Sequence, residues 1–166
     1  MSRDPVMLDW DTVGATDPGG KMTDGDSRSG VPLSSAAVEL RVAAELENLA
    51  VMRTLVGAVG TFSDLDFDAV ADLRLAVDEA CTRLIRSAVP GATLVVVVDP
   101  RDDVVVVEAS TECATDDVVM PGSFSWHVLS SLTHDLQTFR DGNAPGGTDG
   151  RIFGITLTTR RAGASR

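Results

Sequence analysis

Glu79 and Arg83 are the pair of charged residues whose spacing could most directly support chemistry. They lie four residues apart in the segment from Phe67 to Val89. In a helix this spacing brings the two side chains together, and an acid on the N-terminal side of a base is the more favourable order. A surface ion pair of this kind contributes about 0.3–0.5 kcal/mol. The spacing alone therefore favours a structural salt pair over a catalytic carboxylate.

The histidines and cysteines give weaker signals. His127 and His134 are seven residues apart on one predicted helix. With no third ligand nearby, this favours helix surface over a metal site, so no metal is expected. Cys81 and Cys113 match neither a disulfide framework nor a zinc ligand set. A redox switch stays open as an alternative, although Cys81 lies on an apolar stripe and Cys113 lies among acids that raise a thiol's pKa.

Composition limits the classes of partner. The chain has 166 residues, 43% of them hydrophobic, with 14 basic and 25 acidic residues and a net charge of −11. One domain, with a possible tail, fits this length. The negative charge disfavours nucleic acid and anionic membrane surfaces. The acidic, Gly-rich start is unlike a secretory signal, and no apolar run reaches the ~20 residues of a membrane helix. We therefore expect a cytoplasmic protein.

Residues 1–34 are predicted to be a disordered acidic tail, and residues 35–166 a folded domain. The first segment has six Asp and no sustained hydrophobic periodicity, which is typical of disorder. Trp10, with Val6, Met7 and Leu8 nearby, is the one cluster there that could dock on a surface. An unused apolar island is the alternative.

Two helices are predicted in the first half of the domain. A half-buried strand over 36–43 precedes a helix over 45–60, with Arg53 at the margin of its apolar stripe and free to reach outward. Asp64 or Asp66 can cap the next helix, over 67–89. Its core stripe recurs at intervals of three and four residues: Val70, Leu73, Val77, Cys81, Leu84 and Ala88. The other side carries Asp72, Glu79, Arg83 and Arg86, with Ala76 beside them.

The second half reads as strands around one helix. Valine-rich strands over 94–98 and 104–107 form an antiparallel hairpin in the middle of a sheet. An acidic loop over 110–122, a helix capped by Ser123, a strand over 135–140, a connection over 141–150 and a strand over 151–159 follow. This order indicates an α+β fold: a two-layer α/β sandwich with a mixed, mostly antiparallel sheet and helices on one face.

Two segments of the sequence resemble a known protein family. The segment AVDEACTRLIRSA resembles the N-box helix of the GHKL ATPases, within them the anti-sigma factor kinases of the RsbW and SpoIIAB type. That helix reads approximately A-V-x-E-A-x-x-N-x-I-x-H, so Glu79 matches and Arg83 replaces the asparagine. The segment ELENLAVMR resembles the family's first helix, whose arginine contacts both the sigma factor and the anti-anti-sigma protein, and Arg53 falls on it. The similarity extends from about Ala37 to Arg161 and implies the GHKL (Bergerat-type, HATPase-like) sandwich.

The resemblance implies ATP and Mg²⁺ as the family's cofactors, but the nucleotide motifs are degenerate here. Thr111 and Cys113 replace the Asp and Gly of the adenine loop, and Ser123 and Ser125 replace glycines of the phosphate loop. Arg83 replaces the magnesium ligand, and a guanidinium has no lone pair for a metal. Glu79, the family's catalytic base, is retained.

Arg83 can be interpreted in two ways. As a structural substitute, it pairs with Glu79 and fills the vacated pocket with its own charge. As a functional one, it binds phosphate directly without Mg²⁺. We favour the first interpretation, because no second basic residue converges there.

The function implied by the resemblance is that of an anti-sigma factor. Such a protein holds an alternative sigma factor of the stress or stationary-phase type away from RNA polymerase, and anti-anti-sigma (STAS-type) antagonists release it. The family forms homodimers. The alternative is an active serine-protein kinase that phosphorylates the anti-anti-sigma factor with ATP, so enzyme activity is left open by the sequence.

Overall fold

The fold is a two-layer α+β sandwich. A computed structural model describes residues 32–141 and 151–163. Its strands are β1 (Val38–Ala43), β2 (Thr93–Pro100), β3 (Val104–Cys113), β4 (Asp135–Asp141) and β5 (Arg151–Arg160). Its helices are the short 3₁₀ helix η2 (Leu46–Asn48), α1 (Leu49–Phe62), α2 (Phe67–Ser87) and α3 (Phe124–Leu132). The order of strands and helices is the predicted one.

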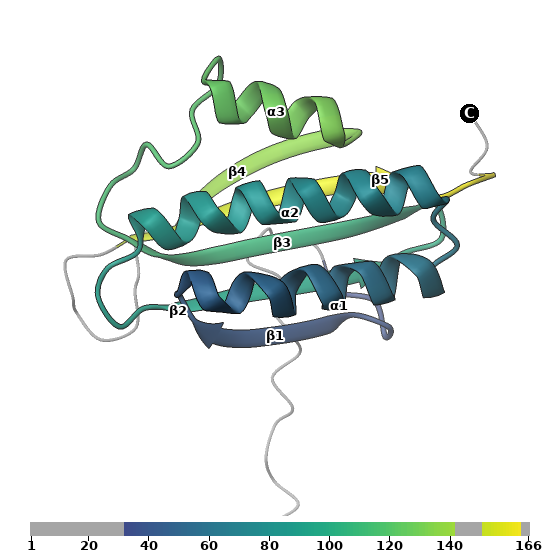
Figure 1. Ribbon diagram of the computed structural model, residues 1–166, viewed down its shortest axis with the longest axis horizontal. Coiled ribbons are helices and arrows are strands. Elements are labelled where there is room, and N and C mark those ends of the chain that lie inside the picture. Colours follow the sequence, from purple (N-terminus) through teal and green to yellow (C-terminus); the bar gives the residue numbers. More distant parts are fainter. Residues whose placement is uncertain (1–31, 142–150, 164–166) are drawn as a thin grey trace, which may run out of the picture.

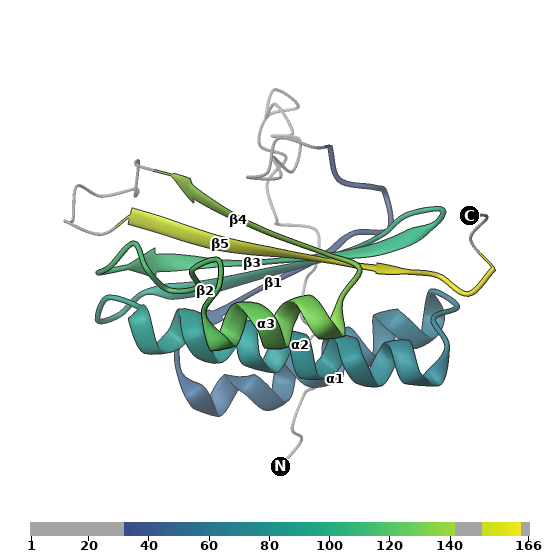
Figure 2. The same ribbon diagram turned by 90° about the horizontal axis from the view of Figure 1, so that it is seen from above.

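The strands form one sheet in the order β1-β2-β3-β5-β4. Every pairing between these described strands is antiparallel, rather than mixed. The three α-helices cover one face of the sheet (Figures 1 and 2). The predicted fold class is therefore confirmed. Within the described residues, no helix combines the length and apolarity needed to cross a membrane.

The first helix begins and ends later than predicted. The turn η2 takes its first residues, and α1 runs through Gly57 and Gly60 to Phe62. Gly60 is buried, and a Cβ there would lie 3.2 Å from the side chain of Leu65. Glycine is unfavourable inside a helix, but its lack of a side chain here lets Leu65 of the following turn pack closely against α1.

Helix α2 is the central element of the helical layer. Asp66 caps it by accepting a hydrogen bond from the backbone N–H of Ala69 at 2.7 Å. Leu73, Val77 and Leu84 are buried, as predicted. Ala76, expected on the polar side, is also fully buried. The buried face of α2 is wider than the single stripe predicted.

Strand β3 is longer than predicted, and the acidic loop is correspondingly shorter. Residues 110–113, expected in the loop, pair with residues 151–154 of β5. The buried Thr111 hydroxyl donates to the Thr93 carbonyl at 2.9 Å. A threonine that satisfies its hydroxyl this way can lie in a buried strand, which hydropathy alone does not indicate.

Helix α3 ends earlier than predicted. It stops at Leu132, and Thr133 is already extended. His134 therefore lies beyond the helix, where its Nδ1 accepts a hydrogen bond from the Arg160 backbone N–H at 3.3 Å. The prediction that His127 and His134 share one helix is wrong. Ser123 caps α3 through the N–H of Trp126, as predicted.

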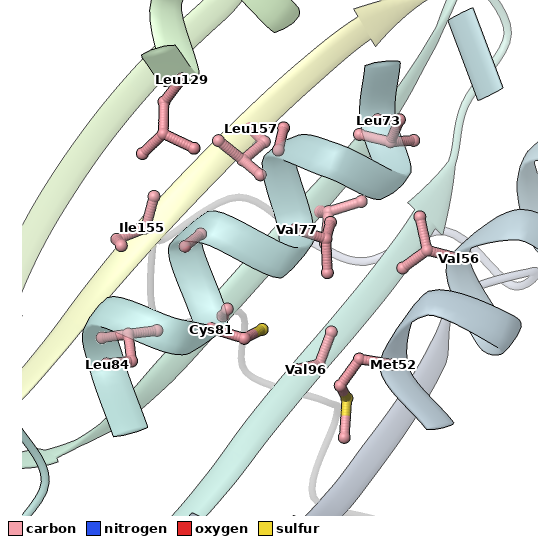
Figure 3. Packing of buried hydrophobic residues seen from close by; sticks show 14 of the residues in the cluster. Met52, Val56, Leu73, Val77, Cys81, Leu84, Val96, Leu129, Ile155 and Leu157 are labelled. Atoms are coloured by element: carbon pink, nitrogen blue, oxygen red, sulfur yellow. The ribbon is translucent and has the colours of Figure 1, made fainter. Parts of the chain in front are cut away.

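The core lies between the sheet and the three helices. Figure 3 shows Met52 and Val56 of α1 and Leu73 and Val77 of α2 facing the strands. Leu129 of α3 and Ile155 and Leu157 of β5 continue the same cluster. Phe139 of β4 lies over Gly154, where a Cβ would come within 2.0 Å of its ring. Any larger residue at that position of β5 would have to displace the Phe139 ring.

The chain enters the domain just before β1. The Ser34 backbone N–H donates to an Asp99 carboxylate oxygen at 3.1 Å, and its hydroxyl donates to the Pro100 carbonyl at 3.0 Å. Most of the predicted tail, residues 1–31, lies outside the described residues, as does the predicted connection over 142–150.

Candidate functional site: the α2–α3 junction and the α1–α2 groove

Glu79 stands at a polar junction between α2 and α3. Its Oε1 accepts a hydrogen bond from Arg83 Nε at 2.8 Å and another from the Ser125 hydroxyl at 2.8 Å. Glu79 and Arg83 are partly buried, and Ser125 is buried. The expected pairing of Glu79 with Arg83 is thus present. We call these three residues the α2–α3 junction.

The junction lowers the pKa of Glu79. Burial alone would raise this pKa, but the hydrogen bonds from Arg83 and Ser125 and the charges of Arg83 and Arg86 outweigh it, so the net shift is downward. A carboxylate with a lowered pKa that already accepts two hydrogen bonds is a weak proton acceptor. The two hydrogen bonds therefore make Glu79 less basic than a catalytic base would need to be. Arg86 contributes through its charge, an effect that the sequence interpretation did not include.

Sequence reasoning did not identify Ser125 as a partner of Glu79. It marked Ser125 only as a replacement for a loop glycine. The two residues are 46 positions apart, and their contact depends on how α3 packs on α2. The only available signal was the Ser123 cap, which fixes where α3 begins and so which residues its first turn presents.

The other residues of the degenerate nucleotide motifs are committed to the fold. Thr111 bonds across the sheet to Thr93, and Cys113 is buried at the end of β3. No group of three or more His, Cys, Asp or Glu that could hold a metal occurs in the part of the chain that the structure describes. With Arg83 in the place of a metal ligand, these residues do not fit Mg²⁺ and its nucleotide.

Both cysteines are free and buried. Burial raises the pKa of Cys113 to about 11. Burial, together with the charge of Asp78, raises the pKa of Cys81 to about 12. The cause at Cys113 is therefore burial rather than the neighbouring acids expected from the sequence. Neither thiol has the exposed, low-pKa character of a redox sensor.

The acidic loop before α3 is tied to the sheet. Arg140 Nη2 donates to the Asp116 backbone carbonyl at 2.5 Å, and Arg151 Nη1 lies 3.0 Å from the Asp116 carboxylate. The loop has no basic residue of its own, but β4 and β5 supply two. This places the loop's charge against arginines of the same chain.

Arg53, the predicted partner-binding residue, lies on the outer surface of α1. Its side chain is 46% exposed, and its Nε lies 2.9 Å from Asp78 Oδ1 on α2. Arg53 is exposed at the margin of the apolar stripe, as predicted, but it is not free, because it pairs with Asp78 of the neighbouring helix. The pair meets the distance for an ion pair, yet Asp78 Oδ1 is buried without a well-aligned donor among the described residues. Such a pair is held loosely, because a short N–O distance without alignment is a poor hydrogen bond.

A groove lies between α1 and α2 and is lined by both helices and the turn that joins them. It has a volume of about 610 Å³, and Arg53, Gly57 and Arg74 are among its lining residues. Phe62 and Phe67, also in the lining, are 89% and 87% exposed. Exposed aromatic side chains gathered at one groove are typical of a binding surface. We call it the α1–α2 groove.

The fold and the N-box-like helix α2 define the class of protein: a GHKL-type α/β sandwich. No family model matches the sequence. The sequence is similar to two curated proteins, both named anti-sigma-F factor RsbW, from strains CDC 1551 / Oshkosh and ATCC 25618 / H37Rv of Mycobacterium tuberculosis. Each is 67% identical over 156 residues, which covers 93% of this chain and 92% of the relative. The chain belongs to the RsbW family of anti-sigma factors.

Proposed function

We propose that this protein is an anti-sigma factor that binds an alternative sigma factor and keeps it away from RNA polymerase. The observation that carries the proposal is the 67% identity, over 93% of the chain, to proteins named as anti-sigma-F factors. The partly exposed Arg53 on α1 supports it, because the family's partner-contacting arginine falls at this position.

Release is proposed to occur through an anti-anti-sigma protein of the STAS type. The resemblance assigns the same arginine to both partners, so the two would compete for one surface around Arg53. Competition requires no covalent change in this protein. The cytoplasm is the proposed location, since RNA polymerase and its sigma factors work there.

The protein kinase alternative is not favoured by the geometry. Phosphoryl transfer relies on positioned phosphates, a metal ion and an available base. Here Glu79 already accepts hydrogen bonds from Arg83 and Ser125, and its pKa is lowered. We propose that partner exchange is governed by binding competition and not by ATP.

A homodimer is also proposed, as the resemblance implies. Val95 and Val97 of β2 are not part of the core cluster under the helices, and they alternate with Val96 and Val98, which are. They therefore belong to the face of the sheet opposite the helices, where both side chains are already buried within the single chain, so the homodimer rests on the resemblance. Light scattering should give the mass of two chains, and a monomer at every micromolar concentration would refute this assignment.

Reconstituted transcription tests the main proposal. Each alternative sigma factor from the same genome is combined with core RNA polymerase and a cognate promoter, with and without the purified protein. One sigma factor should lose activity in proportion to the protein added, and ATP should make no difference. Inhibition of none of them would refute the anti-sigma proposal. Inhibition that ATP relieves in the presence of an anti-anti-sigma protein would favour the kinase.

A further inference from the structure

The α1–α2 groove has a chemistry that restricts its occupant. Its aromatic end is formed by Phe62 and Phe67, and the charged side chains in its lining are the two arginines Arg53 and Arg74. The chain as a whole carries a net charge of −11. An aromatic groove whose charged lining residues are Arg74 and the loosely paired Arg53 favours an apolar segment that also carries carboxylates.

The aromatic end of the groove and the start of the described chain lie at the same end of the molecule, although on opposite faces of the sheet (Figure 2). Arg161 connects the two places: its Nε donates to the carbonyl of Ser63, the residue after Phe62, at 2.5 Å. Its backbone N–H and its Nη1 bond to the carbonyls of Asp103 and Asp102, in the β2–β3 turn. The same turn region holds Ser34 through Asp99 and Pro100. The chain therefore enters the domain at the end of the molecule that also holds Phe62 and Phe67, and the segment before it must pass around the sheet to reach the groove.

One stretch of the N-terminal segment has the matching chemistry. Residues 4–11 read DPVMLDWD, with four apolar side chains (Val6, Met7, Leu8, Trp10) among three aspartates. Eight residues cover at least about 12 Å even when helical, which is comparable to the length of α1 between Arg53 and Phe62. The residues between this stretch and Pro32 span up to roughly 65 Å when extended, so the tether does not limit the reach.

We propose that residues 4–11 of the chain dock in the α1–α2 groove. Their apolar side chains cover Phe62 and Phe67, and their aspartates face Arg53 and Arg74. Because the segment is tethered, its effective concentration at the groove is on the order of millimolar, so even a weak contact is populated. A second part of the proposal rests on the proposed anti-sigma function: the docked segment competes with the sigma factor for the surface around Arg53. The N-terminal stretch then acts as an internal competitor that lowers partner affinity.

Tryptophan fluorescence of the full-length protein tests the docking without any partner. The chain has two tryptophans, Trp10 and Trp126, so Trp126→Phe leaves Trp10 as the only reporter. The expected result is a blue-shifted emission and several-fold weaker acrylamide quenching than in a synthetic peptide of residues 1–14. Adding Phe62→Ser and Phe67→Ser should return both signals to the peptide's values. Circular dichroism verifies that each variant is folded.

A matched control is Leu75→Ser, which removes an apolar side chain of α2 that is 59% exposed and lies outside the groove lining. It should leave the Trp10 signals unchanged. Trp10 behaving like the free peptide in the otherwise native chain would overturn the proposal. So would protection that survives the phenylalanine changes, because the segment would then dock elsewhere. Protection that disappears on dilution would assign the groove to a second copy of the chain and would equally overturn it.

The competition is tested separately with the sigma factor found in the transcription assay. Leu8→Asp combined with Trp10→Asp should raise the affinity for that sigma factor several-fold. Unchanged affinity would refute the competition. A failure to find any sigma factor would count against the proposed function alone, because the fluorescence result does not depend on one.

Discussion

The α2–α3 junction and the α1–α2 groove differ in how well their charged side chains are paired within the chain. At the junction, Glu79 accepts hydrogen bonds from Arg83 and from the buried Ser125. At the groove, Arg53 is loosely paired and Phe62 and Phe67 are almost fully exposed. One place satisfies its polar groups within the chain, and the other leaves both charge and apolar surface available. The difference supports the proposals that a partner binds at the groove and that Glu79 serves a structural role at the junction.

The largest expected effect is at the groove. Arg53→Glu should abolish sigma-factor capture, because it removes an anchor and places a like charge against a partner acid, a penalty of several kcal/mol. Fold stability should fall by about 1 kcal/mol or less, since the lost pair with Asp78 is partly exposed and poorly aligned. Capture is measured by surface plasmon resonance, and stability by urea unfolding. Arg160→Glu, a change of the same charge at the exposed end of β5, is the control, and unchanged capture by Arg53→Glu would remove Arg53 from the partner surface.

The next effect concerns the junction and is a loss of stability. Ser125→Ala removes a buried donor to a carboxylate and should lower the free energy of unfolding by about 1 kcal/mol, with sigma-factor capture unchanged. Ser131→Ala removes an exposed hydroxyl on the same helix, one that donates only to the Val128 carbonyl, and should have almost no effect. Equal unfolding curves for the two variants would show that the junction adds no stability.

A smaller effect is the pH dependence of the junction. The pKa of Glu79 is lowered in the folded protein, so its stabilisation is fully present above the carboxyl's ordinary pKa and is lost as pH falls through the lowered value. The stability difference between the native protein and Glu79→Gln should therefore shrink as pH drops below about 4.5. Asp99 also has a lowered pKa, so the comparison must be a difference between the two proteins at each pH. A constant difference from neutral pH to pH 3 would contradict the assignment.

The last prediction is that Mg-ATP has no effect on this protein. Calorimetry with Mg-ATP should show no binding heat, and labelled phosphate should not be transferred to an anti-anti-sigma protein. Arg83→Asn restores the family's residue and tests whether Arg83 alone blocks the site. Micromolar affinity of the native protein for Mg-ATP, with phosphate transfer lost in Glu79→Ala, would support the kinase alternative. The junction would then be a catalytic site and not a structural one.

The elements that could be predicted from the sequence are those with a strong local signal. The stripe of α2 and the valine runs of β2 and β3 repeat with the helical and strand periods, so their type and pairing followed. The Ser123 cap followed from side-chain chemistry, which also narrowed the cap of α2 to Asp64 or Asp66; the structure selects Asp66. The last residues of β3 did not, because the signal for Thr111 is a hydrogen bond to Thr93 across the sheet.

The two regions compared above depend on contacts between elements, and these were predicted less well. The ion pair of Glu79 with Arg83 lies within one helix and was foreseen. Ser125 and the Arg53–Asp78 pair join separate helices, and no local pattern encodes them. The exposure of Phe62 and Phe67 was also missed, because it depends on the angle at which α1 turns into α2.

The position of β5 in the sheet has a consequence for synthesis of the protein. This strand is made after every other described strand and helix, yet it lies between β3 and β4 and contributes Phe153, Ile155 and Leu157 to the core. Until it leaves the ribosome, β3 and β4 have no partner at their facing edges, and the helices lack part of the surface they pack against. The nascent chain can form the β2–β3 hairpin and its helices early, but it cannot close its core. A chain that is cut short before β5 would therefore be recognised by proteases and chaperones rather than by a transcription factor.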